Sequence, residues 1–271
     1  MCGYMKISPS AYYQWRKRGK SKRELVNELI LAEIRKIHKE QGKETYGADR
    51  IQPELVTRIG ITACPDRIRR IMKQNNIRAF VRRKKFRYPK DTKSDLPVAD
   101  NILDRDFTAE AENRKWVSDI TYIRTNQGWL YLCIVLDLYS KRVVGWSMDN
   151  NLKTDLVLSA LNMAVSRRDV SKDLIFHSDR GSQYRSHEFR NRLNKLEFVQ
   201  SMSRKGNCWD NACAEAFFKT IKTELIYERF FKTYEEAKTC IFEYIEVFYN
   251  KIRRHSSIGN LSPEEFEEKC A

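Results

Sequence analysis

The sequence contains little that would build a disulfide-linked or zinc-binding fold. Its seven cysteines are odd in number and scattered, and none of them forms a Cys-x-x-Cys pair. The four histidines are equally dispersed. Because disulfide frameworks and zinc ribbons or fingers need paired ligands at short spacings, we expect neither, and no zinc domain at the N-terminus.

Long apolar segments are also missing. The longest apolar run, residues 129–136, is far too short to span a bilayer, and the first residues lack the apolar stretch of a secretory signal. No internal repeat or low-complexity tract is present. We therefore expect a cytoplasmic protein without a membrane partner.

Positive charge, by contrast, is abundant. The 271 residues include 51 Lys and Arg against 36 Asp and Glu, which gives a net charge of +15. A hydrophobic content of 41% is enough for one full-sized domain and smaller ones beside it. The charge favours a polyanionic partner such as nucleic acid, although a basic ribosomal or membrane-surface protein would carry the same excess.

Three acidic residues stand where apolar segments meet polar ones. Asp119 interrupts the strand-like run 116–123, Asp179 ends the run 174–179, and Glu215 lies in the helix-like stretch 210–226. Carboxylate oxygens are the ligands that Mg²⁺ prefers, and two divalent ions about 4 Å apart can activate the nucleophile and stabilise the leaving oxygen of a phosphodiester. The three acids therefore predict a two-metal site for phosphoryl transfer on DNA.

Each acid also has a plainer explanation. An Asp at a strand end is commonly a turn residue, as we expect for Asp137, and Glu215 with Lys219 could be a surface pair. A helical wheel, however, places Lys219 and Lys222 on one face with Glu215, opposite the apolar residues, so that all three are displayed together. Asp119 lies on the apolar side of its strand, where a carboxylate is costly unless it is bound to something. These patterns favour metal ligation for all three acids.

The N-terminal third has a helical pattern with basic residues. A capping box of Ser21 and Glu24 starts a helix over residues 21–39, and two shorter helices follow at about 47–58 and 65–75. This order is typical of a helix-turn-helix, with Ile68, Ile71 and Met72 facing inward; an ordinary three-helix bundle with solvated arginines would have the same spacing. Pro53 predicts a break in the middle helix near Gln52.

Residues 109–227 change to an α/β pattern. Strands are predicted at about 115–124, 129–136, 142–148, 174–177 and 198–202, with helices at 154–167 and 186–196 among them. That order predicts a mixed five-stranded sheet with helices, the ribonuclease-H-like fold of the α/β class. The whole chain then divides into a basic and aromatic segment (1–20), a helix-turn-helix-like all-α domain (21–80), a basic linker (81–108), the catalytic core (109–227) and a C-terminal helical extension (228–271).

Several basic side chains are candidates for DNA contacts. Aromatic residues interleaved with the basic linker favour an extended arm along DNA over a simple solvated linker. Trp209 could either stack on a base or anchor the following helix, and we expect His177 to be structural. The candidate DNA-binding residues are Arg67, Arg69, Arg70, Lys73, Arg82, Arg83, Lys84, Lys85, Arg204, Lys205, Lys219 and Lys222.

The motifs around these residues resemble a known family, the second-frame (OrfB-type) transposases of bacterial insertion sequences, which carry a retroviral-integrase-like (DDE) core. The 35 residues between Asp179 and Glu215 are the gap that this core places between its second Asp and its Glu. The resemblance covers nearly the whole chain. It rests on Tyr46-Gly47 with Arg50-Ile51, on residues 68–72, 116–122, 177–184 and 203–212, on residues 215–218 with Lys222, and on residues 249–250, 254–257 and 261–263.

The resemblance implies an enzyme that binds the terminal inverted repeats of its element, cleaves to expose 3′-OH ends and joins them to target DNA. It places Asp119, Asp179 and Glu215 on the catalytic triad, with two Mg²⁺ or Mn²⁺ ions, and Lys222 on the basic residue seven positions later. It also implies a homo-oligomer in a synaptic complex, a first-frame part that this sequence does not contain, and a place at the bacterial nucleoid.

Two other functions are compatible with the same residues. A DNA-binding regulator or inhibitor of transposition would use the helix-turn-helix and the basic arm while the triad stays idle. A simple metal-dependent nuclease would cleave DNA without joining it. An assay with end-sequence DNA and Mg²⁺ separates the three.

Overall fold

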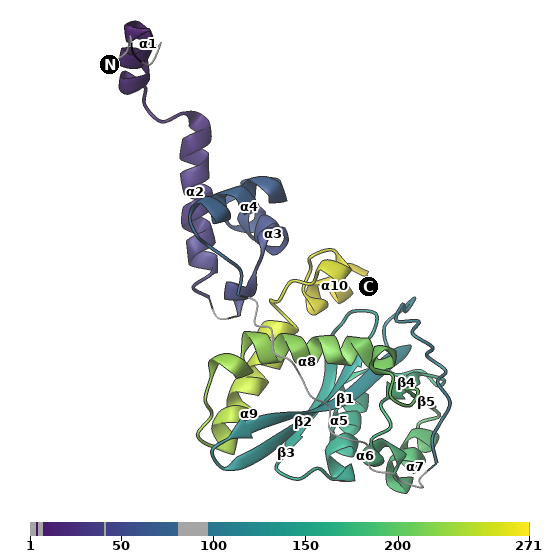
Figure 1. The fold of residues 1–271 in the computed structure, drawn as a ribbon. Coiled ribbons are helices and arrows are strands. Elements are labelled where there is room, and N and C mark those ends of the chain that lie inside the picture. Colours follow the sequence, from purple (N-terminus) through teal and green to yellow (C-terminus); the bar gives the residue numbers. More distant parts are fainter. Residues whose placement is uncertain (1–3, 5–7, 41, 81–96, 271) are drawn as a thin grey trace. The chain divides into compact units, whose positions relative to one another are not determined.

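The structure is a computed structural model that describes residues 4, 8–40, 42–80 and 97–270. The chain divides into two compact units, residues 1–80 and 81–271 (Figure 1). Among the described residues, no helix has the length and apolar character needed to cross a membrane.

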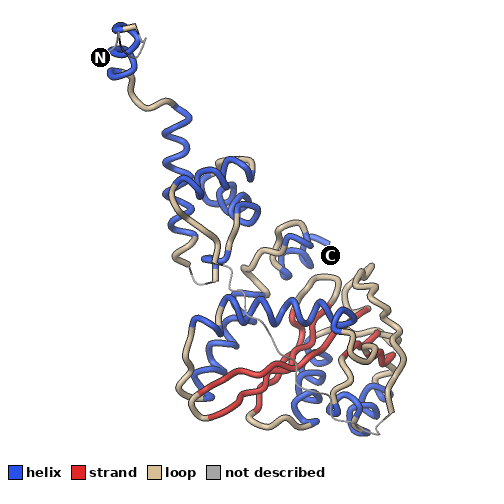
Figure 2. Tube along the Cα trace, viewed as in Figure 1, coloured by secondary structure: helices blue, strands red, loops and turns tan. Residues whose placement is uncertain are grey.

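The first unit is all helical (Figure 2). Its capping box is present as predicted, because Ser21 Oγ accepts the Glu24 N–H and the Glu24 carboxylate accepts the Ser21 N–H. The inward positions Ile68, Ile71 and Met72 are buried against the preceding helices, also as predicted. The elements are α1 (Pro9–Lys17), α2 (Lys22–Ile37), the 3₁₀ turn η1 (Lys43–Thr45), α3 (Ala48–Ile59) and α4 (Pro65–Gln74).

Helix α3 passes through Pro53 without interruption, so the break predicted near Gln52 is wrong. Proline removes one backbone hydrogen bond from a helix interior. Here Ile51 and Leu55 are fully buried on either side of it, and Glu54 accepts hydrogen bonds from Lys43 of η1 and from Arg58 on the next turn of α3. This packing outweighs the one lost backbone bond.

The second unit is built on the predicted mixed five-stranded sheet, in the order β3-β2-β1-β4-β5. The first three strands are antiparallel to one another, whereas β4 pairs parallel with β1 and with β5. This is the ribonuclease-H-like arrangement. The strands are β1 (Lys115–Thr125), β2 (Gly128–Asp137), β3 (Val143–Asp149), β4 (Ile175–Ser178) and β5 (Val199–Met202).

Helices cover both faces of this sheet (Figure 1). Alternation along the central strand β1 sends Val117 and Ile123 into a core with α8, and Trp116 into a second core with α5 and α7. Residue 119 therefore belongs to the face that α8 covers. The helices are α5 (Thr154–Arg167), α6 (Ser182–Arg185), α7 (His187–Lys195) and α8 (Ala212–Glu224), with 3₁₀ turns η2 (Cys208–Asn211) and η3 (Ile226–Glu228) next to α8.

The C-terminal part is helical, as predicted. Thr233 caps α9 (Tyr234–Phe242), and Ser262 with Glu265 caps α10 (Pro263–Cys270). After Phe242 the helix widens into a π-helix over Glu243–Tyr249, and a 3₁₀ turn (Ser256–Ile258) follows. The helix-like stretch 210–226 is likewise divided, since α8 begins only at Ala212.

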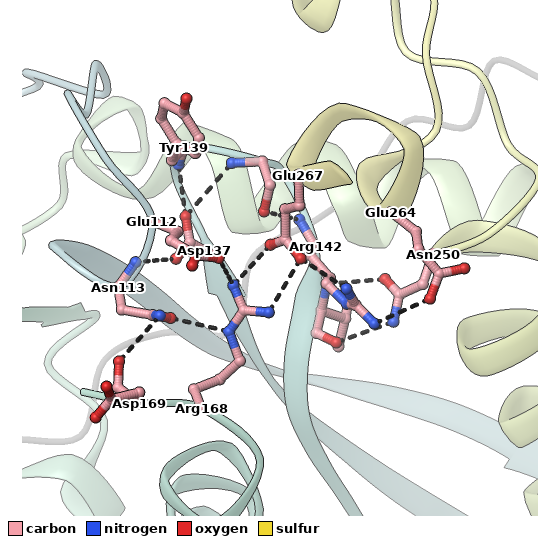
Figure 3. A network of polar contacts seen from close by, with 12 residues as sticks. Glu112, Asn113, Asp137, Tyr139, Arg142, Arg168, Asp169, Asn250, Glu264 and Glu267 are labelled. Atoms are coloured by element: carbon pink, nitrogen blue, oxygen red, sulfur yellow. Dashed lines mark hydrogen bonds and ion pairs between the residues drawn. The ribbon is translucent and has the colours of Figure 1, made fainter. Parts of the chain in front are cut away.

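A polar network ties α10 to the sheet (Figure 3). Arg142 and Arg168 both bind the Glu267 carboxylate, at 2.6 and 2.7 Å. Asp137 is fully buried and accepts the backbone N–H groups of Asn113 and Tyr139. Asp137 is thus the turn residue that the sequence predicted, with its carboxylate satisfied by the backbone.

Candidate active site

The three acids come from three elements that meet at one end of the sheet. Asp119 lies in β1, on the face covered by α8, and Asp179 follows directly after β4. Ser118 pairs with Ser178 in the parallel register, so Asp119 and Asp179 continue the two neighbouring strands at the same level. Glu215 lies in the first turn of α8, the helix that packs on this face.

The charges of the three acids act on one another. Burial raises the pKa of Asp119 well above its usual range, and the negative charges of Asp179 and then Glu215 add to the increase. A hydrogen bond of 2.8 Å from the Ile120 N–H to Asp119 Oδ1 opposes this shift only in part. Burial also raises the pKa of Glu215. The site therefore gathers negative charge around Asp119, with Asp119 and Glu215 half-buried and Asp179 exposed.

The chemistry of this cluster fits a divalent cation, although the carboxylates are not closed around one. In the part of the chain that the structure describes, no three acidic, histidine or cysteine side chains lie closely enough to hold a metal ion. The donors are nevertheless all carboxylate oxygens, which Mg²⁺ and Mn²⁺ prefer, and a cation would relieve the repulsion that raises the pKa of Asp119.

The two predicted DNA-binding lysines of α8 differ in their exposure to solvent. Lys219 is exposed, as expected for a displayed side chain, but Glu215 and Lys222 are half-buried. Burial lowers the pKa of Lys222, and the nearby Asp119 carboxylate partly reverses that effect. Lys222 therefore lies beside the acidic cluster. The helical wheel predicted that Glu215, Lys219 and Lys222 would be displayed together, but of these only Lys219 is exposed.

The loop before α8 is held by a buried carboxylate. Asp210 is fully buried and accepts hydrogen bonds from the guanidinium groups of Arg204, at 2.9 Å, and Arg105, at 2.8 Å. The Arg204 guanidinium holds the pKa of the Asp210 carboxyl well below its usual range. Arg204, a predicted DNA contact, thus already has a structural partner, whereas Lys205 is exposed.

Trp209 in the same loop is 69% exposed, so it does not anchor α8 in the core. Of the two predicted roles of Trp209, the remaining one is stacking on a base, which needs an accessible ring. His177 is fully buried in β4, and its ring nitrogens lie 2.8 Å from Ser201 Oγ and 3.1 Å from Ser203 Oγ. Burial lowers the pKa of His177 to about 4, so this side chain is neutral and held by the sheet.

In the helical unit, the predicted contacts on α4 are only partly available. Arg70 and Lys73 are exposed. Arg69 pairs with Asp66, and Arg67 Nε donates to Asn27 at 2.9 Å. The predicted contacts Arg82, Arg83, Lys84 and Lys85 lie outside the described residues.

Sequence reasoning missed three residues that shape the site. Arg105 and Asp210 fix the loop before Glu215, and the Asn211 side chain bonds to β1 beside Asp119. Spacing from the acids could have drawn attention to Asn211, which lies four positions before Glu215. The Arg105–Asp210 and Asn211–Ser118 contacts join segments 105 and 93 residues apart, so no local sequence pattern predicts them.

The chain is similar to known protein families and to solved structures. Residues 109–208 and residues 215–270 match two models described as an integrase core domain, and residues 24–85 match an HTH-like domain. The fold is also similar to a chain of the simian T-cell lymphotropic virus intasome, with a TM-score of 0.49 and 15% identity over 80% of this chain and 70% of that one. The catalytic domain of Mos1 mariner transposase gives a TM-score of 0.43 with 18% identity, over 50% of this chain and 71% of that one.

Relatives found by sequence have much higher identity to this chain than these solved structures do. The IS600 uncharacterized 31 kDa protein of Shigella sonnei is 41% identical over 99% of this chain and 98% of its own length. Transposase InsF for insertion sequence IS3A of Escherichia coli is 38% identical over 99% of this chain and 93% of its own length. At this identity over nearly full length, the chain belongs to the family of insertion-sequence transposases that includes InsF, enzymes with an integrase core behind an HTH-like domain.

Proposed function

We propose that this chain cleaves the 3′ ends of its insertion sequence and transfers them to target DNA, with Asp119, Asp179 and Glu215 as the catalytic, metal-binding acids. One observation carries the assignment. Asp119 and Asp179 continue the neighbouring strands β1 and β4 directly after the paired residues Ser118 and Ser178, and Glu215 lies in the first turn of α8, which packs on the same face of the sheet. The negative charges of Asp179 and Glu215 also act on Asp119, which supports a single site for the three carboxylates.

Mg²⁺ or Mn²⁺ is the cofactor, with two ions in each site. When bound, such ions activate an oxygen nucleophile, stabilise the leaving oxygen and neutralise charge at the phosphorus centre. The three carboxylates would hold them. The chain's own contribution is to bring these oxygens together, with Asp119 and Glu215 half-buried and Asp179 open to solvent.

Basic side chains on α8 and in the preceding loop hold the DNA backbone next to the acids. Lys222 is positioned by the same helix as Glu215 and lies close enough to Asp119 for the two charges to interact. Lys219 and Lys205 are exposed and can reach phosphates further along the strand. Lysine acts here as a point charge toward phosphate, which orients the scissile bond without sequence selectivity.

The helical unit recognises the element's ends. Arg70 and Lys73 project from α4, whose apolar side is buried, which is the arrangement of a recognition helix. With Arg67, Arg69 and the linker residues Arg82, Arg83, Lys84 and Lys85, they bind the terminal inverted repeats. The protein works as a homo-oligomer in a synaptic complex, together with the first-frame product, at the nucleoid in the cytoplasm.

The experiment is an incubation of the chain with labelled end-sequence DNA, target DNA and Mg²⁺. The proposal expects cleaved 3′ ends and products joined to the target. Cleavage without any joined product would indicate a metal-dependent nuclease. DNA binding without cleavage, also in the presence of the first-frame part, would indicate a regulator that does not use the triad.

A further inference from the structure

Asn211 occupies the N-cap position of α8 but does not cap the helix. An Asn at this position normally accepts a backbone N–H from the first turn with its side-chain oxygen. In this structure the Asn211 side chain makes no such hydrogen bond. Its Nδ2 instead donates to the backbone carbonyl of Ser118 at 3.2 Å. The common explanation for an Asn before a helix is therefore excluded.

This bond joins two elements that carry the acids. Ser118 is the residue before Asp119 in β1 and is paired with Ser178, the last residue of β4. Asn211 thus binds β1 at the level where β4 ends and the Asp179 loop begins. Four residues further along its own helix stands Glu215. A single side-chain amide therefore links the start of α8 to the strand positions of the other two acids.

The other half of this amide has no partner. Asn211 is 4% exposed, and its Oδ1 is buried without a hydrogen bond to any described group. Buried amide oxygens in native proteins are nearly always bonded, because an unpaired acceptor loses its water without compensation. The amide cannot reverse to relieve this, since the Ser118 carbonyl requires an N–H donor. The oxygen is therefore held without a hydrogen-bond partner on the side chain that binds the Ser118 carbonyl, one residue before Asp119.

We propose that Asn211 is an additional residue of the metal site. Its Nδ2 keeps α8 in register with β1, and its Oδ1 supplies a neutral oxygen to the hydrated divalent cation held by the acids. This inference rests on the function proposed above. It adds Asn211 Oδ1 as a specific donor to that site and explains why this buried oxygen has no hydrogen-bond partner among the described residues.

Asn250 provides a matched comparison. It is equally buried, at 2% exposure, and its amide both accepts from the Val143 N–H and donates to the Val143 carbonyl, each at 3.0 Å. Asn250 therefore ties two segments together as Asn211 does, but with both halves of its amide satisfied. Loss of Asn250 should lower stability without changing the response to a cation.

The test measures thermal unfolding of the full chain across a titration with Mn²⁺ or Mg²⁺, without DNA. Wild type should be stabilised by the cation, and Asp119→Asn should lose that response. Asn211→Ala should weaken cation binding about 10- to 100-fold, the usual effect of removing a supporting group from a metal site. Asn211→Asp, which keeps an oxygen but cannot donate to Ser118, should lower the unfolding temperature without cation and still bind the cation. Asn250→Ala should lose stability and keep the cation response of wild type.

The outcomes separate the two proposals. If Asp119→Asn loses the response while Asn211→Ala keeps it in full, the role of Asn211 is wrong and the acidic site stands. If Asn211→Asp binds the cation as weakly as Asn211→Ala, the oxygen is not a donor and the inference also fails. If wild type shows no response, both the metal site and the inference built on it are contradicted.

Discussion

At the scale of single residues, neighbouring carboxylates serve opposite purposes. Asp210 is paired with two guanidinium groups, and its pKa is held well below the usual range by Arg204. Asp119 lacks such partners, and its pKa is raised by burial and by the other acids. The Asp210 carboxylate fixes the loop, whereas the Asp119 carboxylate, with the Ile120 N–H as its hydrogen-bond donor, can still bind a cation.

The Asp210 pairing predicts a specific dependence of stability on pH. Because its pKa is lower in the folded than in the unfolded protein, the pairing contributes full stability above the unfolded value of about 3.8 and loses it as the pH falls further. Asp210→Asn should destabilise the protein by about 1–3 kcal/mol, equally at pH 5 and pH 8.

Urea unfolding at pH 8, 5 and 3 checks this prediction. At pH 3 the difference between variant and wild type should be smaller than at pH 5 and pH 8. Asp104→Asn is the control, because Asp104 also pairs with Arg204 but is 72% exposed, and it should have little effect. An Asp210→Asn effect that grows toward acid pH would contradict the assignment.

At the scale of elements, the fold depends on close contacts behind the site. Helix α5 crosses β3 at Gly145, where an added Cβ would lie 2.3 Å from the Ala160 carbonyl oxygen and 2.7 Å from the Ala164 backbone nitrogen. Since both neighbours are backbone atoms, neither can move aside cheaply. Gly145→Ala should destabilise the protein by at least about 1–3 kcal/mol, and a chemical unfolding curve that matches wild type would contradict this packing.

The C-terminal end of α8 is anchored by a buried ion pair. Arg253 and Glu224 are 3% and 5% exposed, with Nη2 and Nε of Arg253 each 2.9 Å from a Glu224 oxygen, and the Tyr244 hydroxyl donates to Glu224 at 2.6 Å. Because α8 also carries Glu215, this anchor fixes the helix at the end opposite to Asn211.

Removing one member of the buried pair leaves an uncompensated charge. Arg253→Leu should therefore cost about 3–5 kcal/mol of unfolding free energy, and the double variant with Glu224→Leu should cost less than the single one. Arg167→Leu breaks an exposed pair with Glu246 and should cost under about 1 kcal/mol. Equal losses for Arg253→Leu and Arg167→Leu in urea unfolding would show that the buried pair does not anchor α8.

Much of this element structure follows from local patterns. Periodicity and capping residues predicted α5 over 154–167 and the cap of α2, because those signals lie within a few residues of each helix. The π-helix after Phe242 and the continuity of α3 through Pro53 were not predictable in the same way, since tertiary packing decides both. The three acids were predicted to form one site from their residue types and their places at segment boundaries. The Asn211 bond to Ser118 could not be predicted, because it depends on a contact across 93 residues.

At the scale of the whole molecule, the net charge of +15 predicts binding to DNA that is strongly sensitive to salt. With six or more phosphate contacts, the affinity should fall by about 10³-fold or more between 50 and 200 mM salt. Changing Arg70 and Lys73 to Ala should lower the slope of log affinity against log salt by about two. Fluorescence anisotropy with duplex DNA measures this slope, and an unchanged slope would remove these residues from the DNA interface.

The central claim is that three distant acids make one catalytic site for DNA strand transfer. The most direct measurement compares end cleavage and joining by wild type, Asp119→Asn, Asp179→Asn and Glu215→Gln with Mg²⁺, together with DNA binding in EDTA. The exposed acid Asp155, changed to Asn, is the control and should keep wild-type activity. Each triad variant should lose cleavage and joining while binding DNA as well as wild type or more tightly, since removing a negative charge cannot weaken attraction to phosphate. Normal cleavage by any one of the three variants would contradict the account.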